Sequence, residues 1–328
     1  MQIYLTFDYE LYFGARTGTV EKCITGPTAL LTEMADRQGI KLCQFVDIGF
    51  LIKLEEAIVK YPHLQQDYTL ISRQLEQLHK TGHDLQLHIH PHWEDSYYDG
   101  NRWHCRVDRY KLSDFNDHEI ADIVHRYKSA LARFCDPAQL TAFRAGGWCI
   151  QPFERFKDVF RANGITTDSS VFANGYYESA QYAYDFRGAP LKGKYNFSTD
   201  PVIEDPEGTF TELPISSIYN SPLFYWRLFL LGRMNPHLHK PLGDGIPISA
   251  PGQRFSLLTR WTHNTVSVDG YNASLLNRAY RQHKRRKQEQ MVIIGHPKSL
   301  TRYGLKALEQ FVEKRKADNH FVTFKNPQ

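Results

Sequence analysis

His83-Asp84-Leu85-Gln86-Leu87-His88-Ile89-His90-Pro91-His92-Trp93 is a stretch that places four histidines within ten residues. Its first part alternates apolar and polar residues, which predicts a β-strand over residues 84–89 that runs into the histidines. Histidine is the commonest metal ligand among side chains. We therefore interpret the cluster as a metal site at a strand end, although a histidine run can also be solvated or make structural hydrogen bonds.

The segments on both sides of this stretch alternate between strand and helix patterns. Strands are predicted over residues 2–7, 41–46, 140–143, 165–167, 291–295 and 320–324, and helices over residues 27–37, 68–80, 116–134, 152–163 and 300–317. Such alternation predicts parallel βα units. Seven or eight units would close into a barrel, and 328 residues suit a single catalytic domain of that kind.

One region departs from this alternation. Residues 174–270 are rich in proline, glycine, asparagine and aromatic residues, with one strong strand pattern at 210–215. We interpret them as an insertion within the domain, before the last strands, that forms a lid over the barrel mouth. An apolar helix pattern at 223–231 suits core packing, or contact with lipid or a partner. A basic helix pattern follows at 280–287.

Reactive side chains follow one predicted strand after another. They are Asp8, Glu10, His88, His90, His92, Arg144, Asp168 and His296. In a parallel barrel the carboxyl ends of all strands lie on one face. We therefore expect these side chains to converge.

Four of these residues have the chemistry of a zinc site. Asp8 and Glu10 are two apart on a strand and point the same way, so a divalent cation would relieve their repulsion. His88 and His92 have the spacing of helical zinc motifs. With one carboxylate they make the two-His-one-acid set that leaves a position open for water. His90 is the alternative to His92, because residues two apart share a face of a strand.

Five motifs occur in order along the chain: Thr6-Phe7-Asp8-Tyr9-Glu10, residues 82–92, Phe143-Arg144-Ala145-Gly146-Gly147-Trp148, Thr167-Asp168-Ser169-Ser170 and Ile294-Gly295-His296. Together they resemble the NodB-homology polysaccharide deacetylases (carbohydrate esterase family 4), in the branch with a spaced Asp-x-Glu first motif. The resemblance implies an α/β fold, a distorted (β/α)7 barrel. It also implies a hydrolase that removes an N-acetyl group from a sugar with the help of a metal.

The resemblance also implies a role for each motif residue. By position, Asp8 matches the general base, Arg144 its partner, His296 the general acid and Asp168 the residue that orients it. Glu10, His88 and His92 match the metal ligands, with Zn²⁺ expected and Co²⁺ or Ni²⁺ as alternatives. Gly147 and Trp148 are the candidates for oxyanion and substrate contacts. The sequence departs from the common pattern at Tyr9, Ile89 and Gly146-Gly147.

Composition indicates which binding partners and which cellular compartment to expect. A net charge of +4 is small for this length and does not suggest nucleic acid. Five cysteines without a CxxC pair favour reduced thiols. The N-terminus lacks a secretory pattern, and no apolar run suits a transmembrane helix. We expect a cytoplasmic enzyme.

We expect the substrate to be an N-acetylated sugar of a surface-polysaccharide precursor of the lipopolysaccharide or O-antigen type, in nucleotide-linked or lipid-linked form, with peripheral membrane contact. Two alternatives stay open. An amidohydrolase-like barrel would use His88-Ile89-His90 in a site with two metals, and a glycan-binding homologue would have lost the chemistry. The oligomeric state is not predicted.

Overall fold

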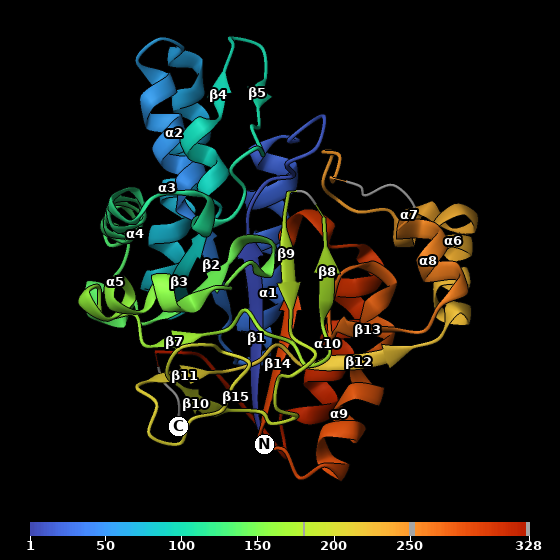
Figure 1. Cartoon of the computed structure of the whole chain (residues 1–328). Coiled ribbons are helices and arrows are strands. Elements are labelled where there is room, and N and C mark those ends of the chain that lie inside the picture. The colour runs from blue at the N-terminus through green and yellow to red at the C-terminus, as the bar shows by residue number, and fades with distance from the viewer. Residues whose placement is uncertain (180, 249–252, 326–328) are drawn as a thin grey trace.

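A nine-stranded sheet forms the centre of the structure, a computed structural model that describes residues 1–179, 181–248 and 253–325 (Figure 1). The strands are β1 (Gln2–Tyr9), β2 (Cys43–Asp47), β3 (Asp84–Ile89), β4 (Tyr97–Tyr98), β5 (Trp103–His104), β6 (Ala142–Ala145), β7 (Thr167–Asp168), β8 (Tyr176–Glu178), β9 (Ala183–Asp185), β10 (Tyr195–Phe197), β11 (Phe210–Glu212), β12 (Ser217–Asn220), β13 (Thr262–Thr265), β14 (Gln290–Gly295) and β15 (His320–Val322).

The sheet is mostly parallel and curls into a barrel. Its order is β10-β11-β7-β6-β3-β2-β1-β14, with β15 paired to β1 and only β10 antiparallel to its neighbour. An isolated parallel bridge joins Ile215, just after β11, to Val292 of β14 and so links the two sides of the curve. The predicted α/β fold, a distorted barrel, is confirmed.

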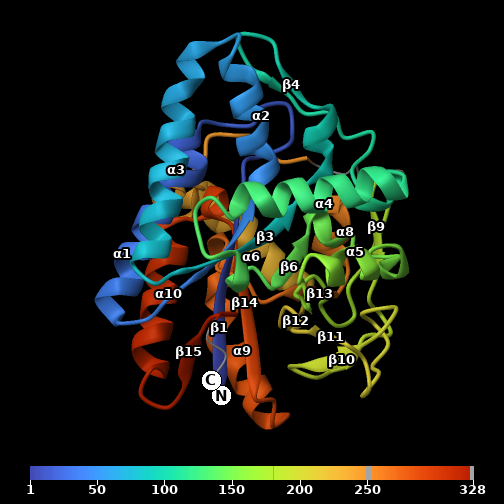
Figure 2. The same ribbon diagram turned by 90° about the vertical axis from the view of Figure 1, so that its left-hand side faces the viewer.

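Helices surround this sheet (Figure 2). They are α1 (Gly26–Gln38), α2 (Ile48–Ile58), α3 (Gln65–Lys80), α4 (Asp117–Leu131), α5 (Lys157–Ala162), α6 (Pro222–Met234), α7 (Pro236–His239), α8 (Gln253–Thr259), α9 (Leu276–Arg285) and α10 (Arg302–Arg315). Among the described residues, none of the helices combines the length and the apolar character needed to cross a bilayer.

Burial explains why the parallel strands form. Every residue of β2, β3 and β6 is buried, as expected for a sheet that is covered on both faces. Helix α3 buries Ile71, Leu75 and Leu78 against it, at helical spacing. Helix α4 begins with the capping box of Asn116 and Glu119. The parallel strands of the sheet run upward in Figure 1, so their carboxyl ends face the upper half of the molecule.

Residues 174–270 do not form a single body outside the barrel. Strands β10 and β11 belong to the central sheet, and Ser267 bridges to Ile294 of β14. The β8–β9 hairpin and the β12–β13 pair lie outside that sheet. Helices α6, α7 and α8 form a group on the side opposite α4 and α5 (Figure 1). Whether these outer parts act as a lid stays a prediction.

Candidate metal and catalytic site

A cavity of about 280 Å³ opens at the carboxyl ends of the barrel strands. Six of the predicted site residues line it: Asp8, Glu10, His88, Gly147, Trp148 and His296. His90 lines it as well. The expected convergence of strand ends is therefore present for most of the predicted residues.

Glu10, His88 and His90 form a buried group whose potential ligand atoms all lie within 4.8 Å of one another. Both imidazoles point Nε2 at the same carboxylate oxygen: Glu10 Oε2 is 3.3 Å from His88 and 2.6 Å from His90. His88 donates its Nδ1–H to the carbonyl oxygen of Arg144 at 2.8 Å, so that Nε2 is the nitrogen directed at Glu10. A backbone carbonyl that fixes the tautomer in this way is the usual support of a metal-ligating histidine.

His92 does not join this group, which differs from the predicted ligand set. His90 has extended backbone angles, and Pro91 then starts a 3-10 turn over Pro91–Asp95. His88 and His90 therefore share one face of an extended segment, and the helical spacing of His88 and His92 is never realised. The His92 ring is buried against Trp93 and Tyr110.

The donor set suits a divalent transition metal. Two imidazole nitrogens and one carboxylate oxygen are the ligands of hydrolytic zinc sites, which keep a further position open. Burial alone would raise the pKa of Glu10, but Lys298 and His90 outweigh it and hold that pKa well below its usual value. Burial lowers the pKa of His90 to about 4. The group thus offers an anion and a neutral imidazole at neutral pH.

Asp8 lies beside this group. One of its carboxylate oxygens accepts a hydrogen bond from Arg144, and the other faces His296 at a longer distance. Arg144 donates from Nη1 to Asp8 Oδ1 at 2.6 Å, and Asp8 Oδ2 faces His296 Nε2 at 3.5 Å. Burial would raise the pKa of Asp8, but Arg144 and then His88 outweigh it, so the pKa is lowered. Arg144 is itself fixed by Ser169, whose carbonyl accepts from Nε at 2.8 Å, and by the Phe45 ring 4.1 Å away.

Asp269 orients His296. Asp269 Oδ2 accepts from His296 Nδ1 at 2.7 Å, and Oδ1 accepts from its backbone N–H at 2.8 Å. Burial would lower the pKa of His296, yet Asp269 and Asp8 raise it to about 9. His296 is therefore cationic at neutral pH, with Nε2 directed toward Asp8.

Asp168 does not occupy the position that the sequence predicts for it. Its carboxylate accepts from Ser170 Oγ at 2.7 Å and from the Ser170 backbone at 3.0 Å. Ser170 Oγ in turn accepts from the backbone N–H of Ala145 at 2.8 Å, next to Arg144. The fourth motif thus supports the strand that carries Arg144, and Asp269 takes the place beside His296.

Solved structures with this architecture were found, whereas no family model and no curated protein matches the sequence. A Mycobacterium smegmatis protein described provisionally as a polysaccharide deacetylase is 14% identical, with 98% of this chain and 86% of that chain covered at a TM-score of 0.52. The catalytic domain of a peptidoglycan N-acetylglucosamine deacetylase from Eubacterium rectale is 12% identical, with coverages of 100% and 90% and a TM-score of 0.42. The Mycobacterium smegmatis structure is similar enough for its fold to be compared with that of this chain. The chain has the fold of a polysaccharide deacetylase.

Two residues of this NodB-like barrel were missed in the sequence. Lys298 is a buried amine that donates to Glu10 Oε1 at 2.8 Å and to the Leu11 carbonyl at 2.6 Å. Asp269 follows the alternating Val266-Ser267-Val268, so it carries the same strand-end signal as the predicted residues. That signal was overlooked because it lies inside the region interpreted as an insertion.

Gly147 and Trp148 lie in the 3-10 turn that follows β6. Gly147 has φ of 59°, and a Cβ there would lie 2.6 Å from the Tyr110 ring. The positive φ favours glycine, and the closeness of Tyr110 leaves little room for a side chain. The turn brings its backbone to the cavity wall, where an oxyanion contact is predicted.

Proposed function

We propose that this protein is a metal-dependent N-deacetylase that acts on an N-acetylated sugar. One observation carries the proposal. A buried pair of imidazoles and a carboxylate lies beside an aspartate held by Arg144 and a histidine held by Asp269. A metal site, a base and an acid thus face one small cavity.

The reaction is the hydrolysis of an amide. A divalent cation held by Glu10, His88 and His90 would supply Lewis-acid polarisation of the acetyl carbonyl. Asp8 Oδ2 takes a proton from the attacking water, and Arg144 keeps this carboxylate ionised. The new C–O bond forms at the acetyl carbon, and the C–N bond then breaks.

His296 completes the reaction as the acid. Its Nε2 proton passes to the departing amine nitrogen, so that acetate and a free amino sugar are released. Asp269 keeps the imidazole cationic and correctly oriented until that transfer. A deprotonated base, Asp8, and a protonated acid, His296, beside the amide that is cleaved are the expected arrangement for acid–base catalysis.

Acetate release tests this proposal. The purified protein, loaded with Zn²⁺, Co²⁺ or Ni²⁺, is incubated with a panel of N-acetylated mono- and oligosaccharides. We expect release that a chelator abolishes and that Asp8→Asn and His296→Ala reduce by at least about 10²-fold. Asp108→Asn, an exposed carboxyl, serves as the control. Metal binding without release across the panel would refute the catalytic proposal.

Metal stoichiometry separates the proposal from an amidohydrolase-like site. Within residues 1–179, 181–248 and 253–325, one group of three potential ligands is found, which supports a single metal. Elemental analysis should therefore give one metal per chain. Two metals per chain would favour the amidohydrolase-like site.

The assignment of the base is tested separately. Normal turnover by Asp8→Asn would show that the base is assigned to the wrong residue.

We further propose that the sugar is carried on a lipid at an anionic membrane surface. Helix α6 exposes more than half of Leu223, Trp226, Leu230 and Met234, and these residues follow one another three or four positions apart along the outer face. Arg227 and Arg233 flank this stripe. Between residues 213 and 268, Asp244 is the single acidic residue.

This combination is typical of an interfacial helix. Exposed apolar side chains insert at the headgroup boundary, and arginines attract anionic lipids. An apolar cavity of about 200 Å³ lies between α6 and α8, lined by Trp226, Leu230 and Leu258 among others. Lipids of that charge are found in the cytoplasmic leaflet, in agreement with the compartment predicted from the sequence.

Vesicle flotation tests the membrane proposal. We expect binding to vesicles that contain phosphatidylglycerol, weakened by salt and reduced at least about tenfold in the double variant Trp226→Ser/Leu230→Ser. Val59→Ser is the matched control, since Val59 is 88% exposed on another surface. Equal binding by both variants would contradict the proposal. A dimer lost only in the double variant would assign the stripe to a second copy of the chain.

A further inference from the structure

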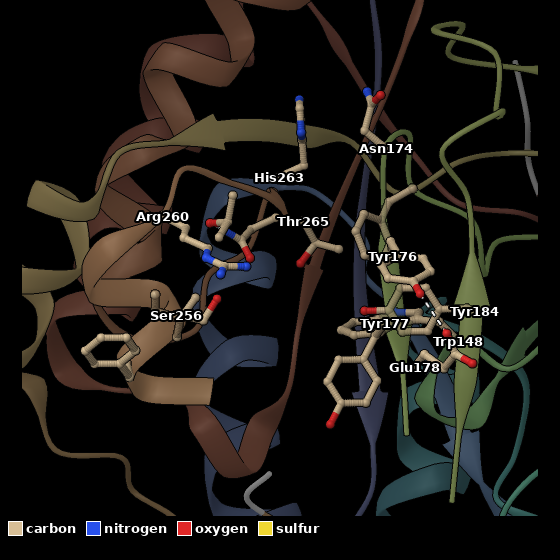
Figure 3. Close-up of a pocket in the computed structure, with 15 residues that line it drawn as sticks. Trp148, Asn174, Tyr176, Tyr177, Glu178, Tyr184, Ser256, Arg260, His263 and Thr265 are labelled. Carbon is tan, nitrogen blue, oxygen red and sulfur yellow. Dashed lines mark hydrogen bonds between the residues drawn. The ribbon is translucent and has the colours of Figure 1, made fainter. Parts of the chain in front are cut away.

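A second cavity of about 730 Å³ lies next to the catalytic cavity (Figure 3). Trp148 lines both. Figure 3 shows one wall formed by the β8–β9 hairpin and Trp148, and the opposite wall formed by α8, β13 and the loop between them. The two walls differ in chemistry.

The hairpin wall is aromatic. Tyr177 stacks on Tyr182 at 4.6 Å between ring centroids and lies 6.3 Å from Tyr184. Tyr184 meets Trp148 edge-on at 5.6 Å. These contacts hold several rings in fixed orientations, so their exposed faces are preorganised as an apolar platform.

This aromatic wall is continuous with the catalytic cavity. Tyr182 lies 5.4 Å from Tyr110, and both rings line the catalytic cavity. Tyr110 lies 5.7 Å from the His90 ring. A ligand bound beside Glu10, His88 and His90 can therefore extend along the rings of Tyr110 and Tyr182 into the second cavity.

The opposite wall combines the apolar Phe255 and Leu257 of α8 with a larger number of hydrogen-bonding groups. Arg260 and Thr265 lie on this side of the space in Figure 3, and Ser256, His263 and Asn264 also line it. The β12–β13 pair supports this wall, and Thr262 is held by Tyr225 at 2.9 Å. On the aromatic wall, Glu178 is already occupied by the hydroxyl of Tyr176 at 2.7 Å.

This pairing of walls matches a carbohydrate. A sugar ring presents an apolar face of C–H groups and a rim of hydroxyls. One arginine and one occupied carboxylate give little net charge, which does not suit a polyanion, and the polar wall does not suit an acyl chain. The volume falls in the range of about 300–1,000 Å³ of typical ligand sites, whereas the catalytic cavity is below it.

We propose that the second cavity binds the sugars that adjoin the acetylated sugar, so that the substrate is an oligosaccharide and the β8–β9 hairpin determines its specificity. This inference rests on the proposed deacetylase function. It makes a free acetylated monosaccharide a poor substrate, because it would occupy the catalytic cavity alone.

Chain-length dependence of turnover tests the inference. We measure kcat/KM of the metal-loaded protein for N-acetylglucosamine and for its β-1,4-linked di- to pentasaccharides, with wild type, Tyr177→Ala, Arg260→Ala and the control Tyr97→Ala. Tyr97 is exposed outside both cavities. Wild type should gain at least about tenfold from mono- to tetrasaccharide, and each cavity variant should lose most of that gain through KM. The control should behave as wild type.

Two outcomes separate this inference from the proposed function. Turnover without a chain-length gain, or an equal loss for short and long substrates in the cavity variants, would overturn the second cavity alone. If nothing is turned over, saturation-transfer NMR with the same tetrasaccharide decides. Binding weakened by Tyr177→Ala would uphold the cavity while the deacetylase fails, and binding unchanged in that variant would overturn the cavity.

Discussion

His90 and His92 are chemically identical and differ in what surrounds their nitrogens. Nε2 of His90 lies 2.6 Å from Glu10, whereas within the described chain neither ring nitrogen of His92 has a hydrogen-bond partner. A buried polar ring without partners adds little to stability, and an apolar residue of similar size can replace it at small cost. The two positions therefore make a matched pair for mutation.

We expect His90→Ala to lower Zn²⁺ affinity by more than about 100-fold, since even loss of a residue that only supports a ligand costs 10–100-fold. His92→Leu should retain Zn²⁺ and unfold at a similar urea concentration. Isothermal titration with Zn²⁺ and urea unfolding measure the two properties. If His92→Leu instead lost Zn²⁺ while His90→Ala retained it, the ligands would be His88 and His92, as the sequence predicts.

Asp269 controls the charge of His296. The acid must be protonated, so activity should fall as pH rises through its pKa of about 9. Asp269→Asn removes the nearest carboxylate and should move this alkaline limb of kcat/KM to lower pH by at least about one unit. Asp168→Asn is the comparison and should leave the limb in place. A shift in Asp168→Asn alone would contradict the assignment.

At the scale of the element, Gly295 couples strand β14 to the acid. A Cβ at Gly295 would overlap the side chain of Val268 and the ring of Phe7. Val268 immediately precedes Asp269, so any displacement of it moves the carboxylate that holds His296. The last residue of β14 is thus restricted to glycine by packing.

We expect Gly295→Ala to destabilise the protein by about 1–3 kcal/mol, as overpacked cores do. It should also reduce kcat more than it changes KM. Urea unfolding and steady-state kinetics would show both effects. Gly188→Ala is the matched control, because a Cβ at Gly188 meets nothing within 4 Å. Full activity in Gly295→Ala would mean that Val268 does not position Asp269.

Across the whole molecule, stability should depend on a buried carboxyl pair. Glu212 lies opposite Asp168 on adjacent strands, and burial raises the pKa of Glu212 well above 4.5. The folded protein therefore holds a proton that the unfolded chain releases. The stability contributed by this group is complete below about pH 4.5 and is lost as pH rises through the folded pKa.

Glu212→Gln removes this dependence because the amide does not ionise. The stability of the variant relative to wild type should therefore increase between pH 5 and pH 8, as measured by urea unfolding at both values. Asp108→Asn, an exposed carboxyl, should show no such trend. A relative stability that falls with rising pH would mean that Glu212 is ionised in the folded protein.

Much of this molecule follows from local sequence. Strands β1, β3 and β14 and the residues at their ends were predictable because burial on both faces leaves long apolar patterns that stop at polar residues. Helix α2 was missed because it begins directly after β2 with the apolar Ile48-Gly49-Phe50-Leu51. No turn residue separates the two elements, so the pattern shows no boundary.

Local sequence does not determine how neighbouring side chains are arranged over short distances. The choice between His90 and His92 depends on how the backbone continues through Pro91, which residue spacing alone does not determine. The partner of His296 depends on which segment lies beside β14, and Ser267 reaches that place only through tertiary pairing. Both questions concern contacts that the chain makes after folding.

The position of β1 has a consequence for how the molecule folds. Its neighbours include β14 and β15, with Gln2 opposite both Gln290 and His320. Asp8 in the same strand is bound by Arg144, which lies 136 residues further along the chain. Contacts of such high order make folding slow. During synthesis on the ribosome, strand β1 therefore remains incompletely paired until β14 and β15 have emerged.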